Sequence, residues 1–151
     1  MINLDPIRPR DAEALVGLMD ELERFYGGEP TEPLDDQLAQ IEAALFCTAP
    51  AAYVLMAWDE DKPAGFASYS FLWPAAGFTK SLYLKELYVA EAYRRTGLGR
   101  QFMDELHRIA RFNECSRVEW TTDAPNEQAR AFYASLGYAE NGSKVFYRST
   151  L

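Results

Sequence analysis

The chain has 151 residues and a formal net charge of −8 at pH 7, and 48% of its residues are hydrophobic. This length suits one domain over residues 1–151 and excludes two domains of ordinary size, and the composition excludes a disordered chain. No leader peptide or membrane-spanning run is apparent, so we expect a cytoplasmic protein without a membrane partner.

The negative charge is concentrated near the start of the chain. Residues 1–42 contain eleven acidic residues and three arginines, and residues 43–151 carry equal numbers of acidic and basic residues. This distribution argues against a nucleic-acid partner, because nucleic-acid binding uses basic surfaces. An acidic segment of this kind attracts a cationic ligand or is only a pair of well-solvated helices, and the sequence leaves both interpretations open.

Hydrophobic periodicity predicts the elements of the first half. Short apolar or alternating runs indicate strands, and apolar residues at helical spacing indicate amphipathic helices. Gly27 and Gly28 are expected to end the first helix. The predicted order is strand, helix, helix and a hairpin of two strands, over residues 2–8, 11–26, 34–46, 51–58 and 64–73.

The second half alternates strands and helices. Gly137 is expected to end a short helix, and the pair Asn141-Gly142 is expected to turn a final pair of strands. The predicted elements are a strand at 81–89, a helix from about residue 98, a strand at 117–122, a helix at 129–136 and the final strand pair. This order indicates an α/β (α+β) fold, a mixed sheet with helices on both faces.

The segment Arg94-Arg95-Thr96-Gly97-Leu98-Gly99 carries the most informative chemistry. Glycines let the backbone approach an anion closely, and the first turn of the following helix offers unpaired N–H groups, so a pyrophosphate fits there. The alternative is a simple tight turn between a strand and a helix. A dinucleotide fingerprint is excluded because its third glycine would fall at Phe102, and a P-loop is excluded because no Gly-Lys-Ser/Thr follows.

Two segments resemble the GNAT family of N-acetyltransferases. LYVAEAYRRTGLG is similar to the family's acetyl-coenzyme A signature, Arg/Gln-x-x-Gly-x-Gly/Ala, with Arg94, Gly97 and Gly99 in the motif positions. VEWTTDAPNEQARAFYASLGY, residues 118–138, is similar to the family's last core strand, its Asn-x-x-Ala helix and its Tyr-x-x-x-Gly ending. The resemblance covers essentially the whole chain and is nearest to the polyamine, small histone and amino-acid acetyltransferase branch.

The resemblance implies a mostly antiparallel twisted sheet of about six to seven strands and acetyl-coenzyme A as co-substrate. The backbone N–H groups from about Arg95 to Arg100 would hold the pyrophosphate. The edge of the strand at Leu87 to Val89 would pair with the pantetheine arm, and the N–H of Val89 would face the thioester oxygen as an oxyanion hole. Asn126 would contact the cofactor, or alternatively cap a helix. The implied cofactor-binding residues are Leu87, Val89, Arg94, Arg95, Thr96, Gly97, Leu98, Gly99, Arg100 and Asn126.

Two residues are implied as catalytic. Tyr133 matches the family tyrosine that protonates the departing thiolate, although helical spacing alone indicates a core position. Glu86 is the candidate base for the amine, with Glu119 and Asp123 as rivals and a structural ion pair as the alternative. Strand alternation is expected to place Glu86 on the face of Leu84 and Tyr88. Lys85 departs from the polyamine enzymes, which carry an acid at that position.

The resemblance also implies an acceptor wall built from the first two helices and their connecting loop. The acidic residues there predict a cationic small-molecule amine or a basic peptide as acceptor. No metal is expected, since His107, Cys47 and Cys115 have no zinc-site spacing, and the absence of a motif cysteine favours direct transfer in a ternary complex. The predicted wall residues are Glu21, Glu29, Glu32 and Asp35.

Two further expectations concern assembly and the class of protein. Relatives commonly pair through their C-terminal strands, so we expect a homodimer to which Phe146 and Tyr147 contribute. The alternative to an enzyme is a coenzyme A binding or regulatory module without catalysis. A nucleotide-binding protein is a more distant possibility.

Overall fold

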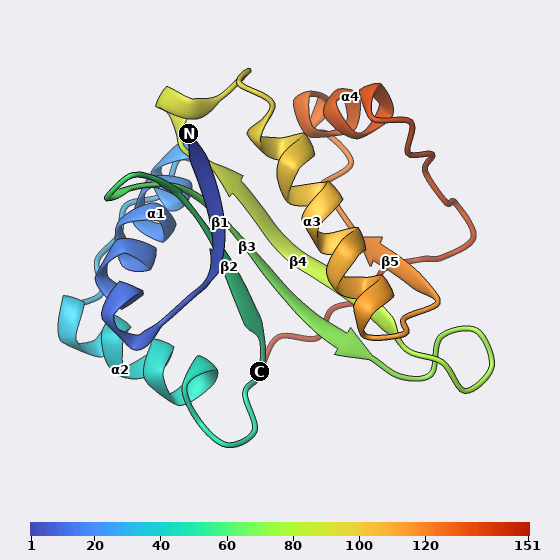
Figure 1. Cartoon of the computed structure of the whole chain (residues 1–151), viewed down its shortest axis with the longest axis horizontal. Coiled ribbons are helices and arrows are strands. Elements are labelled where there is room, and N and C mark those ends of the chain that lie inside the picture. The colour runs from blue at the N-terminus through green and yellow to red at the C-terminus, as the bar shows by residue number, and fades with distance from the viewer. The chain divides into compact units, whose positions relative to one another are not determined.

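The computed structural model describes residues 1–151 and divides the chain into two compact units, Met1–Trp120 and Thr121–Leu151. The first unit holds a sheet and three α-helices, and the second holds one α-helix (Figure 1). No helix is long and apolar enough to cross a membrane.

The sheet has five strands in the order β1-β2-β3-β4-β5. The first four strands are antiparallel, and β5 runs parallel to β4, to which the chain returns through a helix. The mixed, mostly antiparallel sheet confirms the expected fold class, with five strands in place of six to seven. The strands are β1 Ile2–Pro6, β2 Tyr53–Asp59, β3 Lys62–Leu72, β4 Ser81–Val89 and β5 Arg117–Trp120.

Helices cover both faces of the sheet, with α1 and α2 on one face and α3 on the other (Figure 1). Two short 3-10 turns, η1 and η2, precede α1 and follow β4. The bounds are η1 Pro9–Asp11, α1 Ala12–Phe25, α2 Leu34–Leu45, η2 Glu91–Tyr93 and α3 Leu98–Phe112. The predicted end of α1 is confirmed: Gly27 has a φ of 85°, and the N–H groups of Gly27 and Gly28 close the helix onto Arg24 and Glu23.

The core has one layer on each face of the sheet. On the α1 face, Leu15 and Leu18 pack with Met56, Phe66 and Tyr88. On the α3 face lie the buried helix residues, and a Cβ added to Gly65 of β3 would come within 3.2 Å of the Phe102 ring. The buried residues of α3 are Leu98, Phe102, Met103, Leu106 and Ala110.

A bulge in β4 reverses part of the expected alternation. Glu86 lies opposite Ser68 and Leu84 lies opposite Tyr69, so Lys85 is an extra residue without a partner on β3. Glu86 therefore shares the α1 face with Tyr88, and Leu84 lies on the α3 face. The expectation that Glu86 and Leu84 share a face is wrong, because an extra residue shifts the side-chain period of two.

The second unit contains α4, Glu127–Ser135. Its end is the predicted glycine motif: Gly137 has a φ of 90°, and the N–H groups of Gly137 and Tyr138 bond to the carbonyls of Ala134 and Tyr133 at 3.0 and 3.1 Å. The predicted strand pair around residues 141–142 does not form. The Asn141 side chain instead accepts the N–H of Ser143 at 3.0 Å, a local turn that forms without paired strands.

Candidate active site

The connection from β4 to α3 is anchored to the sheet before it reaches the helix. The N–H of Ala90 donates to the carbonyl of Ala64 on β3 at 2.9 Å. The hydroxyl of Tyr93 in η2 donates to Asp59 at the end of β2 at 2.9 Å. This hydrogen bond is the main cause that raises the pKa of Tyr93 above its usual range. Two hydrogen bonds thus attach the start of the turn to β3 and to the end of β2.

The turn itself uses two left-handed backbone conformations. Arg95 has a φ of 61° and Gly97 a φ of 87°, and between them the Thr96 hydroxyl donates to the Tyr93 carbonyl at 2.5 Å. A Cβ added to Gly97 would meet no atom within 4 Å, so its backbone borders open space. The glycine is needed here because an L side chain at this φ is strained.

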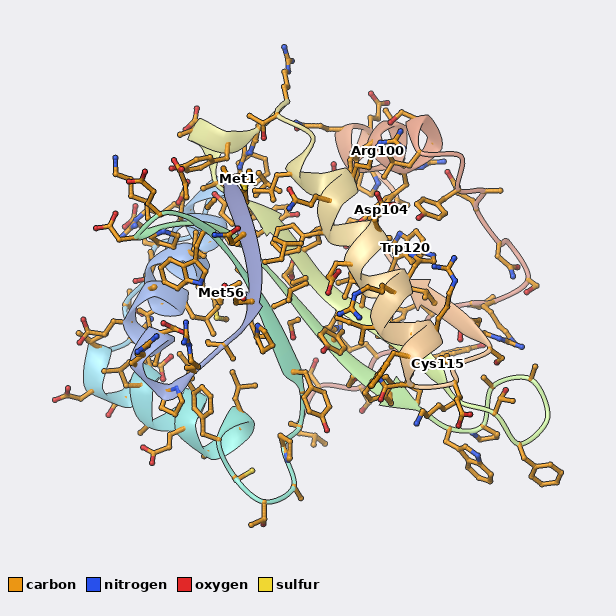
Figure 2. The ribbon with its side chains drawn as sticks, viewed as in Figure 1. Met1, Met56, Arg100, Asp104, Cys115 and Trp120 are labelled. Carbon is orange, nitrogen blue, oxygen red and sulfur yellow. The ribbon has the colours of Figure 1, made fainter.

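Three N–H groups point out of the start of α3. The N–H of Gln101 donates the first backbone hydrogen bond of the helix, to the carbonyl of Gly97 four residues earlier, at 3.0 Å. The N–H groups of Leu98, Gly99 and Arg100 come before Gln101 and have no carbonyl acceptor within the helix. Arg100 lies at this end of α3 (Figure 2). The geometry is that of an anion site at a helix N-terminus.

The neighbouring edge of β4 is only partly used by β5. Pairing runs from Ser81 opposite Arg117 to Leu84 opposite Trp120 and goes no further. Backbone groups alternate in direction along a strand, and the N–H of Ala90 points to β3. The N–H and C=O groups of Leu87 and Val89 therefore point to the opposite edge of β4. The N–H and C=O groups of Leu87 and the N–H group of Val89 could bond to an extended chain laid beside the strand, whereas the Val89 carbonyl already accepts from Arg94 Nε.

The Arg94 guanidinium contacts other groups of the protein. Its Nε donates to the Val89 carbonyl at 3.1 Å and its Nη2 to the Tyr88 hydroxyl at 3.4 Å. The guanidinium carbon also lies 4.5 Å from the centre of the Phe25 ring on α1. Arg95 and Arg100 are exposed, so the three arginines of the turn are in different environments.

The sequence does not predict a role for Tyr88 in the site, because the residue fits the apolar pattern of the strand at 81–89. It is only 5% exposed. Burial, followed by the hydrogen bond to the Glu21 carboxylate and the charge of that carboxylate, raises the pKa of Tyr88 to about 12 against the opposing effect of Arg94. Glu21 also accepts the N–H of Glu91 at 3.4 Å.

The predicted wall residues fall into different places. Glu21 lies against Tyr88 at the end of β4. Glu32 accepts a hydrogen bond from Gln40 and lines a hollow of about 340 Å³ between α1 and α2. Glu29 and Asp35 are exposed. The structure therefore does not gather all four carboxylates at one point.

The candidate bases on the sheet share one face. Glu86 is half-buried beside the bulge of β4. Glu119 on β5 lies opposite Tyr83, and this register puts it on the same face as Glu86. Glu119 is more exposed than Glu86. Asp123 belongs to the second unit.

The remaining predicted residues lie in the second unit. Asn126 precedes α4, and its Oδ1 accepts the N–H of Ala129 at 3.0 Å, so the residue caps the helix. Tyr133 is half-buried on α4, and its ring centre lies 5.1 Å from that of Phe132. A cofactor contact of Asn126 and an acid role of Tyr133 stay predictions.

Comparison with known proteins identifies one family. The model of the Acetyltransferase (GNAT) family matches residues 15–138. An aminoglycoside N(6')-acetyltransferase type 1 of Serratia marcescens is 35% identical over 69 residues, which cover 46% of this chain and 47% of that enzyme. The match thus spans about half the length of that relative.

Two other relatives match over most of the chain. A thialysine N-epsilon-acetyltransferase of Caenorhabditis elegans is 25% identical over 134 residues, which cover 87% of this chain and 79% of that enzyme. An integron cassette protein from the mobile metagenome of V. cholerae has a solved structure with a TM-score of 0.87 and 31% identity. The likeness covers 99% of this chain and 92% of that one.

Proposed function

Because the chain belongs to the acetyltransferase (GNAT) family, we propose that it transfers the acetyl group of acetyl-coenzyme A to a primary amine. One observation carries the proposal: the three outward N–H groups of α3 follow directly on the open edge of β4. An anionic pyrophosphate and an extended amide-containing arm need these two features side by side. The family match runs across both units, which supports their acting as one domain.

The proposed cofactor site is built from backbone groups. The N–H groups of Leu98, Gly99 and Arg100 would bind the pyrophosphate, with Arg95 and Thr96 around it. The outward N–H and C=O groups of Leu87 and the outward N–H group of Val89 would pair with the pantetheine arm as a neighbouring strand does. The open space beside Gly97 supports this assignment, because an anion must approach the backbone there.

Transfer proceeds in one ternary complex. Glu86 would accept a proton from the ammonium through water, and the resulting neutral amine would attack the thioester carbonyl carbon. The C–N bond would form while the N–H of Val89 stabilises the negative oxygen. The C–S bond would then break, Tyr133 would protonate the leaving thiolate, and the proton lost by the new amide nitrogen would restore the Tyr133 hydroxyl. The cysteines support transfer without an acyl-enzyme: burial raises the pKa of the Cys115 thiol, and Cys47 is on no motif position.

The acceptor is proposed to be a cationic small molecule or a basic peptide. The net charge of residues 1–42 supports this class, since α1, α2 and their connection carry nine of the eleven acidic side chains in that segment. Two relatives carry names that refer to aminoglycoside and thialysine acetylation.

We also propose a homodimer through the C-terminal segment, where Phe146 and Tyr147 are 65% and 87% exposed.

The test is thiol release from acetyl-coenzyme A with a panel of amines, followed by mass spectrometry of the products. The proposal predicts release that depends on an amine and an acceptor that gains one acetyl group. Binding of coenzyme A without turnover on any amine would support the module without catalysis. Absence of both binding and turnover would refute both functions.

A further inference from the structure

The peptide group between Val89 and Ala90 is held on both sides. Its N–H, on Ala90, donates to Ala64 of β3 at 2.9 Å. Its carbonyl, on Val89, accepts from Arg94 Nε at 3.1 Å. The group ends the segment of β4 that β5 does not support, because β5 pairing stops at Leu84. Arg94 therefore supplies the fixed partner that a neighbouring strand would otherwise supply.

Arg94 is itself held from the α1 side. Its guanidinium carbon lies 4.5 Å from the ring centre of Phe25 and 5.5 Å from that of Tyr88. The Tyr88 hydroxyl accepts from Arg94 at 3.4 Å and donates to Glu21. Arg94 and Glu21 are thus linked through one buried phenol. A planar guanidinium can stack on a ring while its edge donates hydrogen bonds, whereas an ammonium has no planar face to stack.

We propose that Arg94 is a positioning residue that fixes the open edge of β4 from the α1 side, so that Leu87 and Val89 are preset for an extended arm. Its functional consequence rests on the proposed use of coenzyme A. The competing interpretation is that Arg94 turns to the phosphates and binds them through its charge. The two interpretations differ in which part of coenzyme A the residue serves.

The experiment compares Arg94→Lys and Arg94→Gln with the wild-type protein in two measurements. Amide hydrogen exchange of the ligand-free protein reports the Ala90 N–H, with Phe102 and Leu106 in α3 as internal controls for folding. Calorimetry then measures affinity for coenzyme A and for 3′,5′-adenosine diphosphate, a fragment with phosphates but without the pantetheine arm. Arg95→Gln is the matched variant, since it removes the adjacent charge of the same turn.

The positioning role predicts that both Arg94 variants speed exchange of Ala90 and weaken coenzyme A binding, each about tenfold. Affinity for the adenosine diphosphate is expected to stay unchanged, and Arg95→Gln is expected to leave Ala90 exchange at the wild-type rate. Unchanged exchange in the Arg94 variants, or an equal loss of affinity for both ligands that lysine restores, would overturn the role.

The proposed function can fail separately from the positioning role. If the wild-type protein bound no coenzyme A, the proposed function would fall, while Ala90 exchange would still report whether Arg94 fixes the strand. Faster exchange with unchanged coenzyme A affinity would show that the edge does not serve the cofactor, and would also overturn the proposal.

Discussion

The hydroxyl of Tyr88 donates a hydrogen bond to the carboxylate of Glu21, which joins the end of β4 to α1. The bond connects β4, the strand that leads into the turn before α3, with α1, the helix that carries part of the acidic segment. A substitution of Tyr88 or of Glu21 is therefore expected to affect the position of the other residue.

Removal of this phenol is expected to change how stability depends on pH. The pKa of Tyr88 is raised to about 12 from 10.0, so its contribution is fully present below pH 10 and is lost as the pH rises to 12. A shift of this size corresponds to about 2–3 kcal/mol. In urea unfolding, the stability difference between wild type and Tyr88→Phe is expected to shrink between pH 10 and pH 12. A difference that stays constant from pH 8 to pH 12 would show that folding does not raise the pKa of Tyr88.

A carboxylate at residue 97 is expected to block the anion site. Gly97→Asp would place a negative charge beside the outward N–H groups of α3. The carboxylate could accept hydrogen bonds from these groups as a helix cap does, and would compete with a bound anion. We expect the loss of measurable coenzyme A binding in calorimetry. Gly97→Ala is the control, because it carries the same strain at a φ of 87° without the charge and is expected to keep part of the affinity. Wild-type affinity in the aspartate variant would show that the turn does not bind the cofactor.

Tyr133→Phe is expected to lower kcat by about tenfold to ten-thousandfold, the range around general acid catalysis, with coenzyme A affinity nearly unchanged. In the proposed mechanism, this change removes the proton donor of the leaving thiolate. Tyr147→Phe, which removes a phenol that is 87% exposed, serves as the comparison. Steady-state kinetics with equal rates for wild type and Tyr133→Phe would remove Tyr133 from the mechanism.

The parts of the fold that depend on local sequence could be predicted closely. The strand at 81–89 agrees with β4 at both ends, and the helix ends at Gly27 and Gly137 form as expected. The turn before α3 was also predictable, because Gly97 adopts a conformation that few other residues tolerate.

Features that depend on partners distant in sequence could not be predicted. The extra residue at Lys85 is defined only by the register with β3, and it changes which side chains Glu86 faces. The direction of the Arg94 side chain depends on Phe25 and Tyr88, which the spacing of the motif does not encode. A strand pair around residues 141–142 needs hydrogen-bond partners that a favourable turn sequence does not provide.

The most direct test of the account is the charge preference of the acceptor. Specificity constants for spermidine, lysine, glycine and glutamate are compared at low and high salt, with acetyl-coenzyme A saturating. The account predicts that spermidine and lysine are acetylated best and that their advantage falls at high salt, because surface charges are screened over roughly 8 Å at physiological ionic strength. A higher constant for glycine or glutamate, or a cationic preference that salt does not change, would contradict it.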